Sequence, residues 1–348
     1  MKIFSVIAAV TLMVSSVAWG QTSPAKTLDV LAAYKGADRE KILLEGAKAE
    51  GKIVWYTSLA GASYQAIVEA FERKYPQVKM EVYRAGSKDL APKIFGEAQS
   101  GRQLADAIES TPGILMLLRD KNILQPYSSP ELERYPESAM IKTDGDKIFW
   151  VNDRESFIGF GYNTKLVAES DVPKTYADLL KPMWKGKLAM QLNSTGDRVV
   201  GTMLKQNGPE YIKKFQNHSV KLFKVSGAAL RDLIIAGEVT GSPTIFRNHV
   251  LVKVDAGAPV KWVPMEVVPT NAGGAALINN APHPHAALLF IDFLIGSEGQ
   301  ETLQKFHYGA AWKDYPFKRV YPEAGMTTME YQKAEKKWNK LLRVAGRR

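Results

Sequence analysis

The sequence predicts an α/β protein made of two lobes. Short β-rich runs alternate with helical patterns along much of the chain, which is the signature of a mostly parallel sheet with helices on its faces. The chain has 348 residues. Chains longer than about 250 to 300 residues divide into more than one hydrophobic core. The alternation and the length together indicate two lobes of strands and helices.

The first lobe is predicted from a recurring order of strand and helix. An amphipathic helix over 37–50 ends at Gly51, and the run KIVWYTS follows it as a strand. The next helical pattern stops before Pro76, because proline cannot continue a helix. The same order then recurs twice. Strands are therefore expected at 52–58, 79–86 and 106–111.

The segment 148–163 interrupts this order, because two extended runs follow each other there without a helix between them. We therefore interpret it as a connection between the lobes. A second series of strands and helices runs to about Val260, and a strand at 272–280 then leads into a long two-part helix. The lobes are expected to comprise 27–157 with 263–300 and 158–262 with 301–348, and strands near 157–162 and 260–264 are expected to cross between them.

Residues 1–20 are predicted to be a secretory signal peptide. Lys2 lies in a short basic region, an apolar stretch covers 3–14, and Ala18 and Gly20 are small residues before a cleavage site at Gln21. The apolar stretch is too short to span a hydrocarbon core of about 30 Å. We therefore expect cleavage and export rather than a membrane anchor.

The composition narrows the compartment and the partners. The chain has no cysteine, which leaves no residue for a disulfide or a lipid anchor, and we expect a monomer in the periplasm of a Gram-negative bacterium. The net charge is +10, but the basic residues are dispersed. Their densest run, KAEKKWNKLLRVAGRR, is typical of the solvated face of a C-terminal helix. Nucleic acid is therefore not an expected partner, whereas the positive charge helps to attract anionic solutes.

The most specific pattern is GAALINNAPHPHAALLFIDFLIGSEGQETL, at 274–303. It closely resembles the segment of family 1 extracellular solute-binding proteins in which a strand leads through an NAPHPEAA turn into a helix that ends at SPEGQ. The runs KIVWYTS, MWKGKLAM and AGEV fall in the same order as in that family, and the resemblance covers roughly residues 40 to 312. The subgroup that it resembles most contains the periplasmic ferric-ion-binding proteins and related receptors of ABC importers.

This resemblance implies a two-lobe periplasmic binding protein fold, type II-like, with a hinge and a ligand in an interlobe cleft. In open α/β sheets ligands lie beyond the carboxyl ends of strands, where helix N-termini present free N–H groups. The strand-to-helix turns are therefore expected to face the cleft. Their candidate ligand-binding residues are Ser58, Arg84, Ser87, Ser110, Thr111, Asn193, Ser194 and Thr195. Helix capping by the hydroxyls or by Asp197, and a surface salt bridge of Arg84, are the competing interpretations.

The run TIFRNH decides between ligand types. The iron-binding members carry two adjacent tyrosines after a GEV-type turn, and this chain has Phe246 and Arg247 at about that place. Phenylalanine offers no oxygen ligand, and arginine is a permanent cation that repels ferric ion. A guanidinium instead suits a carboxylate, phosphonate, sulfonate or phosphate ester, which it binds with two parallel N–H bonds. Phe246 would pack on the ligand or in the core, and Arg247 would otherwise be a solvated loop charge.

We expect neither a metal nor a cofactor. His283 and His285 lie in a turn with a proline between them, which is typical of a solvated turn rather than of a metal site. A phosphate-binding GxxxxGK[ST] loop, a GxSxG elbow and an HExxH pair are all absent from the sequence, so an enzyme is not expected.

The predicted function is a periplasmic substrate-binding protein that delivers a small anionic solute to an ABC permease. A ferric-ion-binding protein is an alternative, and a periplasmic enzyme or a module that presents its closed form to a sensor are alternatives from other classes.

Overall fold

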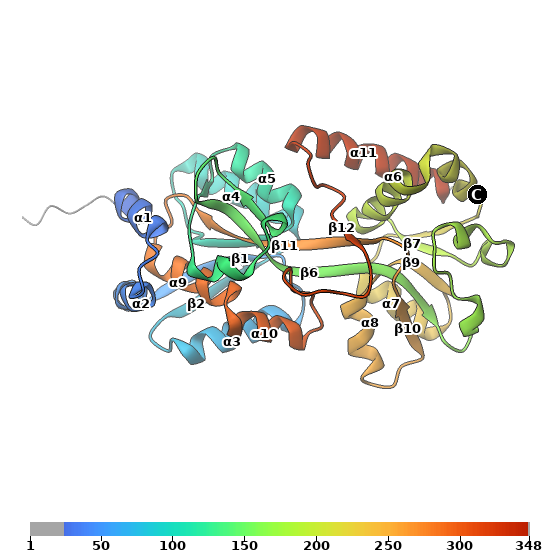
Figure 1. The fold of residues 1–348 in the computed structure, drawn as a ribbon, viewed down its shortest axis with the longest axis horizontal. Helices are drawn as coiled ribbons and strands as arrows, with labels where there is room; N and C mark the ends of the chain where they lie inside the picture. Colours follow the sequence, from blue (N-terminus) through green and yellow to red (C-terminus); the bar gives the residue numbers. More distant parts are fainter. Residues whose placement is uncertain (1–23, 347–348) are drawn as a thin grey trace, which may run out of the picture.

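The computed structural model describes residues 24–346, and the predicted signal peptide lies outside these residues. The described chain forms two lobes that lie side by side along the long axis (Figure 1). Two long strands, β6 (Ile148–Asn163) and β11 (Val268–Ile278), run from one lobe into the other. None of the described helices is both long and apolar enough to cross a membrane.

The first lobe is built on a mixed sheet with helices on both faces. Strands β1 and β2 pair in parallel, β1 also pairs in parallel with β3, and β3 pairs antiparallel with β11. The sheet contains β1 (Lys52–Thr57), β2 (Lys79–Arg84), β3 (Ala107–Ser110), β4 (Leu124–Gln125), β5 (Met140–Lys142) and parts of β6 and β11. Its helices are α1 (Pro24–Ala33), α2 (Arg39–Glu50), α3 (Ala62–Lys74), α4 (Ser87–Ser100), α5 (Pro112–Asp120), α9 (Pro284–Ile295) and α10 (Ser297–Lys305).

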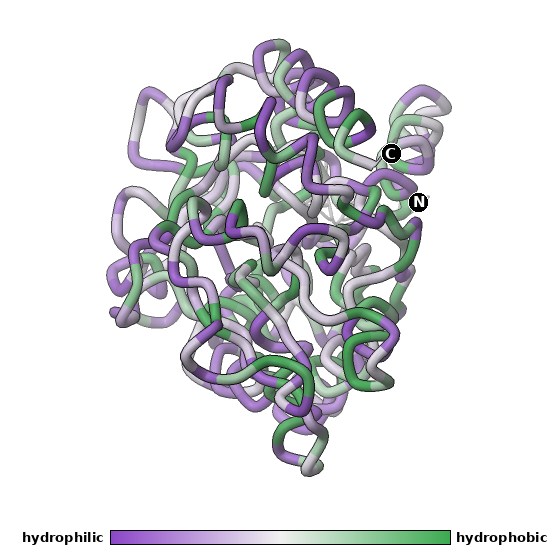
Figure 2. The backbone as a smooth tube through the Cα atoms, turned by 90° about the vertical axis from the view of Figure 1, so that its right-hand side faces the viewer, coloured by the Kyte–Doolittle hydropathy of each residue, from purple (hydrophilic) through white to green (hydrophobic). Residues whose placement is uncertain are grey.

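The second lobe repeats this design around the other half of β6. Strands β9 (Gly241–Phe246) and β10 (Val260–Val263) pair antiparallel with it, while β7 (Ala189–Gln191) and β8 (Lys221–Phe223) pair with each other in parallel. The covering helices are α6 (Ser194–Gln216), α7 (Gly227–Ala236), α8 (Arg247–Val254) and the C-terminal α11 (Thr328–Ala345). Seen from the second-lobe end, the outer helices carry both hydrophilic and hydrophobic residues, as expected for helices that cover a sheet (Figure 2).

The two lobes have separate hydrophobic cores. Trp55, Phe71 and Phe290 are fully buried in the first, and their rings meet at centroid distances of 5.0 and 5.3 Å. Phe160 and Trp184 are fully buried in the second. Each such side chain contributes about 1.5 to 3 kcal/mol by leaving water. Each lobe therefore has a packed core of its own.

The crossing strands differ in part from those expected. Strand β6 runs through both sheets, since its first half pairs with β5 and β11 and its second half with β9 and β10. The segment 260–264 does not cross, because β10 pairs with residues 160–163 inside the second sheet. The second crossing strand is β11, where Thr270 and Asn271 pair with the middle of β6.

The chain after residue 300 also departs from the expected boundary. Leu303, Tyr308 and Ala311 are buried in the core of the first lobe, although 301–348 was assigned to the second. The reason is that α10 continues directly from α9 and packs on α3. Beyond a short strand, β12 (Arg319–Val320), the chain continues as α11, which packs on α6 of the second lobe.

Helix α11 touches both lobes. A capping box of Thr327 and Glu330 fixes its start. Near its C-terminal end it lies against α6, where a Cβ on Gly201 would come within 2.5 Å of the Trp338 ring. Near its N-terminal end it reaches α5 of the first lobe, where a Cβ on Gly113 would come within 2.4 Å of the Tyr331 ring. Glycine at both positions lets the helix approach closely.

Candidate functional site

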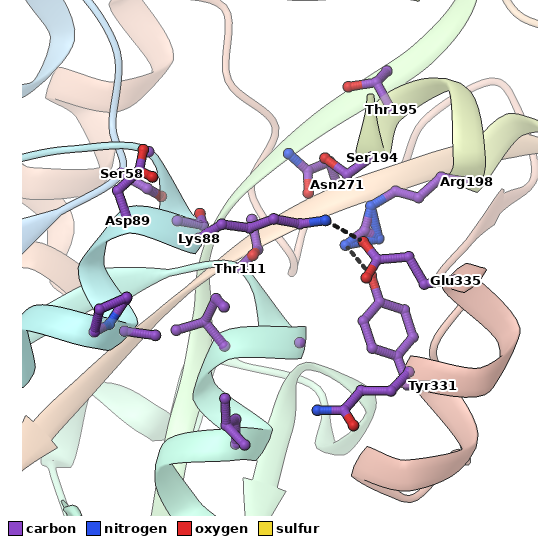
Figure 3. Close-up of a pocket in the computed structure, with 18 of the residues that line it drawn as sticks. Ser58, Lys88, Asp89, Thr111, Ser194, Thr195, Arg198, Asn271, Tyr331 and Glu335 are labelled. Atoms are coloured by element: carbon purple, nitrogen blue, oxygen red, sulfur yellow. Dashed lines mark hydrogen bonds and ion pairs between the residues drawn. The ribbon is translucent and has the colours of Figure 1, made fainter. Parts of the chain in front are cut away.

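A cavity of 670 Å³ lies between the lobes. Helices α4 and α5 of the first lobe form one wall, and the start of α6 together with α11 forms the other (Figure 3). Arg154 of β6 and Asn271 of β11 line it as well. Ligand sites typically measure about 300 to 1,000 Å³, so the cavity has the size of a small-molecule site. We treat it as the candidate functional site.

The N-termini of three helices meet at this cavity, those of α4, α5 and α6. Gly86 precedes α4 in an extended conformation, and Thr111 precedes α5, which begins with a proline. Asn193 caps α6, because its side-chain oxygen accepts a hydrogen bond from the N–H of Thr195 at 2.9 Å. The free N–H groups of a helix N-terminus carry partial positive charge and favour anions.

A buried ion pair forms part of the cavity floor. Nη2 of Arg154 lies 2.8 Å from Oε1 of Glu109, and both side chains are at most 6 % exposed. The other oxygen of Glu109 accepts from the Thr57 hydroxyl at 2.8 Å and from the N–H groups of Ser58 and Leu59 at 3.0 Å. Burial alone would lower the pKa of Arg154, but the charges of Glu109, Tyr308 and Asp153 and the hydrogen bond to Glu109 together outweigh it, and the pKa is raised. Arg154 therefore stays a cation.

The absence of a side chain at Gly273 of β11 leaves space for the Arg154–Glu109 pair. A Cβ at that position would lie 2.4 Å from Oε1 of Glu109 and 2.8 Å from Nε of Arg154. Only a residue without a side chain fits there, so the hinge strand and the ion pair are packed together.

The opposite wall holds a second buried arginine. Nη1 of Arg198, on the first turn of α6, lies 3.0 Å from Oε2 of Glu323. Its Nη2 donates to the hydroxyl of Tyr331 at 3.3 Å. Burial raises the pKa of Tyr331 to about 12, and the hydroxyl is therefore protonated near neutral pH.

A third cation reaches across the cavity. Nζ of Lys88, on α4, lies 3.1 Å from Oε1 of Glu335, on α11, and Figure 3 shows the contact. The Lys88 side chain is 67 % exposed and that of Glu335 is 23 % exposed. Asp89 lines the same cavity. The site thus combines cations, carboxylates, hydroxyls and helix N-termini.

Five of the ten residues predicted from the sequence line this cavity: Ser58, Ser87, Thr111, Ser194 and Thr195. The other five lie elsewhere. Arg84 is exposed, and its Nε donates to the carbonyl of Leu59 at 3.0 Å instead of forming a salt bridge. Ser110 is fully buried, and Asn193 caps α6.

Phe246 and Arg247 also lie outside the lining of the cavity. Phe246 is buried in the core of the second lobe and packs against the ring of His249 at 5.1 Å. Arg247 is the first residue of α8 and is partly exposed. Among the described residues, the arginines that line the cavity are Arg154 and Arg198.

Arg154, Arg198, Lys88, Tyr331 and Glu335 were not predicted as site residues. A signal for the first was present, because NDRES places consecutive polar residues in the middle of an otherwise apolar strand. The last two stand four residues apart on α11, in a pattern that also fits a solvated helix.

The predicted solvated turn at His283 and His285 is more structured than expected. Nδ1 of His283 lies 2.9 Å from Asp106, and Nδ1 of His285 lies 2.7 Å from Glu50. The hydrogen bond that the His283 ring donates to Asp106 raises the pKa of His283. Each histidine thus ties the start of α9 to one carboxylate, and the described residues include no group of three histidines or carboxylates that could hold a metal.

Comparison with known proteins places the chain. Residues 103–338 match the sequence profile of the bacterial extracellular solute-binding proteins. An uncharacterized protein of Haemophilus influenzae is 28 % identical over 275 residues, which cover 74 % of this chain and 77 % of the relative.

Solved structures share the fold at lower identity. Iron-bound HitA of Pseudomonas aeruginosa is 20 % identical with a TM-score of 0.67, and the match covers 85 % of this chain and 99 % of HitA. AfuA of Actinobacillus pleuropneumoniae, a periplasmic binding protein solved with fructose-6-phosphate, is 21 % identical with a TM-score of 0.70 over 84 % of this chain and 99 % of AfuA. The predicted two-lobe fold is therefore confirmed, and the chain belongs to the bacterial extracellular solute-binding proteins.

Proposed function

We propose that this chain is the periplasmic substrate-binding component of an ABC importer and that it captures a small anionic organic solute in the interlobe cavity. The observation that carries the proposal is the convergence of three helix N-termini with Lys88, Arg154 and Arg198 on one cavity. Helix N-termini and guanidinium groups are the devices by which proteins hold carboxylate, phosphonate, sulfonate and phosphate groups. The chain would act as a monomer and release its solute to the permease.

The hydroxyl groups around the cavity support the same ligand class. Ser58, Ser87, Thr111, Ser194 and Thr195 can each donate to an oxyanion while the neighbouring N–H groups do the same. AfuA, which shares the fold, was solved with a sugar phosphate, and a ligand of this general kind suits the polar lining of this cavity.

Ferric ion is the second candidate, because HitA shares the fold and holds iron. Tyrosinate, histidine and carboxylate ligands would be needed. Tyr331 is the tyrosine that lines the cavity among the described residues, and burial raises its pKa to about 12, which disfavours the phenolate. Two buried guanidinium groups would also repel a trivalent cation. The anionic solute is therefore the better supported ligand.

A thermal-shift screen over anionic solutes, followed by native mass spectrometry, tests the proposal. A solute at 100 times its dissociation constant adds about 2.7 kcal/mol to the stability of the protein, which is several degrees in Tm. We expect carboxylates, phosphonates, sulfonates or phosphate esters to give such shifts and to be recovered unchanged. Turnover of the bound solute would instead indicate an enzyme, and a visible absorption band on adding ferric ion would indicate the iron-binding alternative.

A further inference from the structure

We infer that the ligand carries hydrogen-bond donors, hydroxyl or ammonium groups, in addition to its anionic group, and that Glu335 selects for them. This inference rests on the proposed capture of an anionic solute and narrows the class of that solute. It follows from the charges of the cavity, from its volume and from the position of Glu335.

The cations of the cavity already have carboxylate partners. Arg154 is paired with Glu109 at 2.8 Å, and Arg198 is paired with Glu323 at 3.0 Å. Both partners are buried, and neither lines the cavity.

The lining itself adds two carboxylates, those of Asp89 and Glu335. Among the described residues that line the cavity, Lys88 is the cation without a buried carboxylate partner, and it is paired with Glu335. A site for a bare anion would gain by omitting both acidic side chains, because carboxylates accept hydrogen bonds and repel other anions. Their presence is explained if part of the ligand donates hydrogen bonds.

The volume leads to the same conclusion. At about 30 Å³ for each water in the liquid, 670 Å³ corresponds to roughly 20 waters. An inorganic phosphate or sulfate would fill only a small part of this space. A ligand that fills more of it must extend from the anion-binding groups toward other lining residues, which include Asp89 and Glu335.

Glu335 is placed to act on such an extension. Helix α11 is packed on the second lobe, and Glu335 lies four residues after Tyr331, whose hydroxyl contacts Arg198. One oxygen of Glu335 holds Lys88 at 3.1 Å across the cavity. Among the described residues no hydrogen bond occupies its other oxygen, which is therefore available to a ligand hydroxyl or ammonium group.

The test uses three phosphate monoesters that differ at one group: ethyl phosphate, 2-hydroxyethyl phosphate and 2-aminoethyl phosphate. Ethanolamine serves as the donor without the anion. Dissociation constants are measured by calorimetry on the mature protein. We expect 2-aminoethyl phosphate to bind about tenfold or more tightly than ethyl phosphate, which is the effect of one charge-assisted hydrogen bond. The hydroxyl compound should fall between them.

The variant Glu335→Gln then tests the residue. It keeps the size of the side chain but removes the charge, so the preference for 2-aminoethyl phosphate should fall to about threefold or less. Glu301→Gln is the matched control, because Glu301 is an exposed carboxylate on α10 that does not line the cavity. This control should keep the preference of the natural protein.

Each other outcome has a distinct meaning. If ethyl phosphate binds as tightly as 2-aminoethyl phosphate, the inference is wrong and the proposed function stands. If the preference is present but unchanged by Glu335→Gln, Glu335 is not the selecting residue and the inference is wrong in that part. If ethanolamine binds as tightly as the phosphates, the proposed capture of an anionic solute is wrong as well. If no phosphate binds at millimolar concentration, the inference is wrong, and the thermal-shift screen over carboxylates, phosphonates and sulfonates decides the proposed function.

Discussion

The ion pair of Arg154 and Glu109, at the cavity, should contribute to the free energy of unfolding of the protein. Replacing Arg154 with methionine keeps much of the side-chain volume but leaves a fully buried carboxylate without its cation. Breaking a buried pair in this way costs about 3 to 5 kcal/mol. Glu109 keeps three neutral donors within 3.0 Å, so we expect a loss near the lower end, about 3 kcal/mol.

A double-mutant cycle separates the pair from its surroundings. Glu109→Gln alone should cost about 2 to 3 kcal/mol, because the buried guanidinium loses its paired carboxylate and keeps only the charge of Asp153 among the buried acidic residues that act on it. The double variant should lose about 1 to 3 kcal/mol less than the sum of the single losses, since neither charge is then left alone. Urea unfolding followed by tryptophan fluorescence gives the three values.

Arg84→Met is the matched control for this cycle. Arg84 is exposed and makes one hydrogen bond, to a backbone carbonyl, so its replacement should change the free energy of unfolding by about 1 kcal/mol or less. Additivity of the two single losses to within about 0.5 kcal/mol would refute the reasoning, because it would mean that the charges do not interact.

Three further predictions concern pH and ligand binding. Burial raises the pKa of Asp197 from 3.8 to about 6. Between these two pH values the folded state binds a proton that the unfolded state does not bind. The free energy of unfolding should therefore rise by up to about 3 kcal/mol as pH falls from 7 to 4. Asp197→Asn should abolish this rise in urea unfolding at the two pH values, and an undiminished rise would contradict the assignment. Arg198→Ala should weaken binding of the identified solute about 30-fold or more by calorimetry, whereas Arg247→Ala should change it less than about threefold. If both variants lose the same affinity, Arg247 binds the ligand, as its position in the sequence predicts. The hydrogen bond that His283 donates to Asp106 raises the pKa of His283, so the stabilising contribution of this bond should be complete below about pH 6.5 and be lost as pH rises through the raised value. His283→Asn should remove that dependence, and NMR titration of the imidazole would show an ordinary pKa if the reasoning is wrong.

Much of the fold could be predicted because its signals are local. The alternation of strands and helices in the first lobe, the long extended segment at 148–163 and the two-part helix after residue 281 all follow from nearby residues. The second crossing strand was wrong because the short apolar run at 260–263 is equally suited to a hinge or to a sheet edge. Strand β11 was expected to begin only at residue 272, and its first part, which crosses between the lobes, was missed because Pro269 is unusual in a strand.

The site was only partly predictable for a related reason. Thr111, Ser194 and Thr195 follow strands directly, so the rule for strand-to-helix turns finds them. The burial of Arg154 could be predicted only together with its partner Glu109, which lies 45 residues earlier in the sequence. Glu335 lies on a helix whose periodic pattern shows which face is polar but not which polar residues meet the other lobe.

The unbroken strand β6 determines how the lobes can move. It passes from one sheet to the other without a loop, and β11 stays paired with it through the middle. Rotation therefore cannot be concentrated at one freely turning residue and must be shared as small changes in backbone angle along a hydrogen-bonded ribbon. Such a pair of strands has a preferred curvature and resists bending away from it. Any change in the angle between the lobes then costs elastic energy in these strands. Their stiffness would therefore help to set the rate at which a ligand bound between the lobes is released.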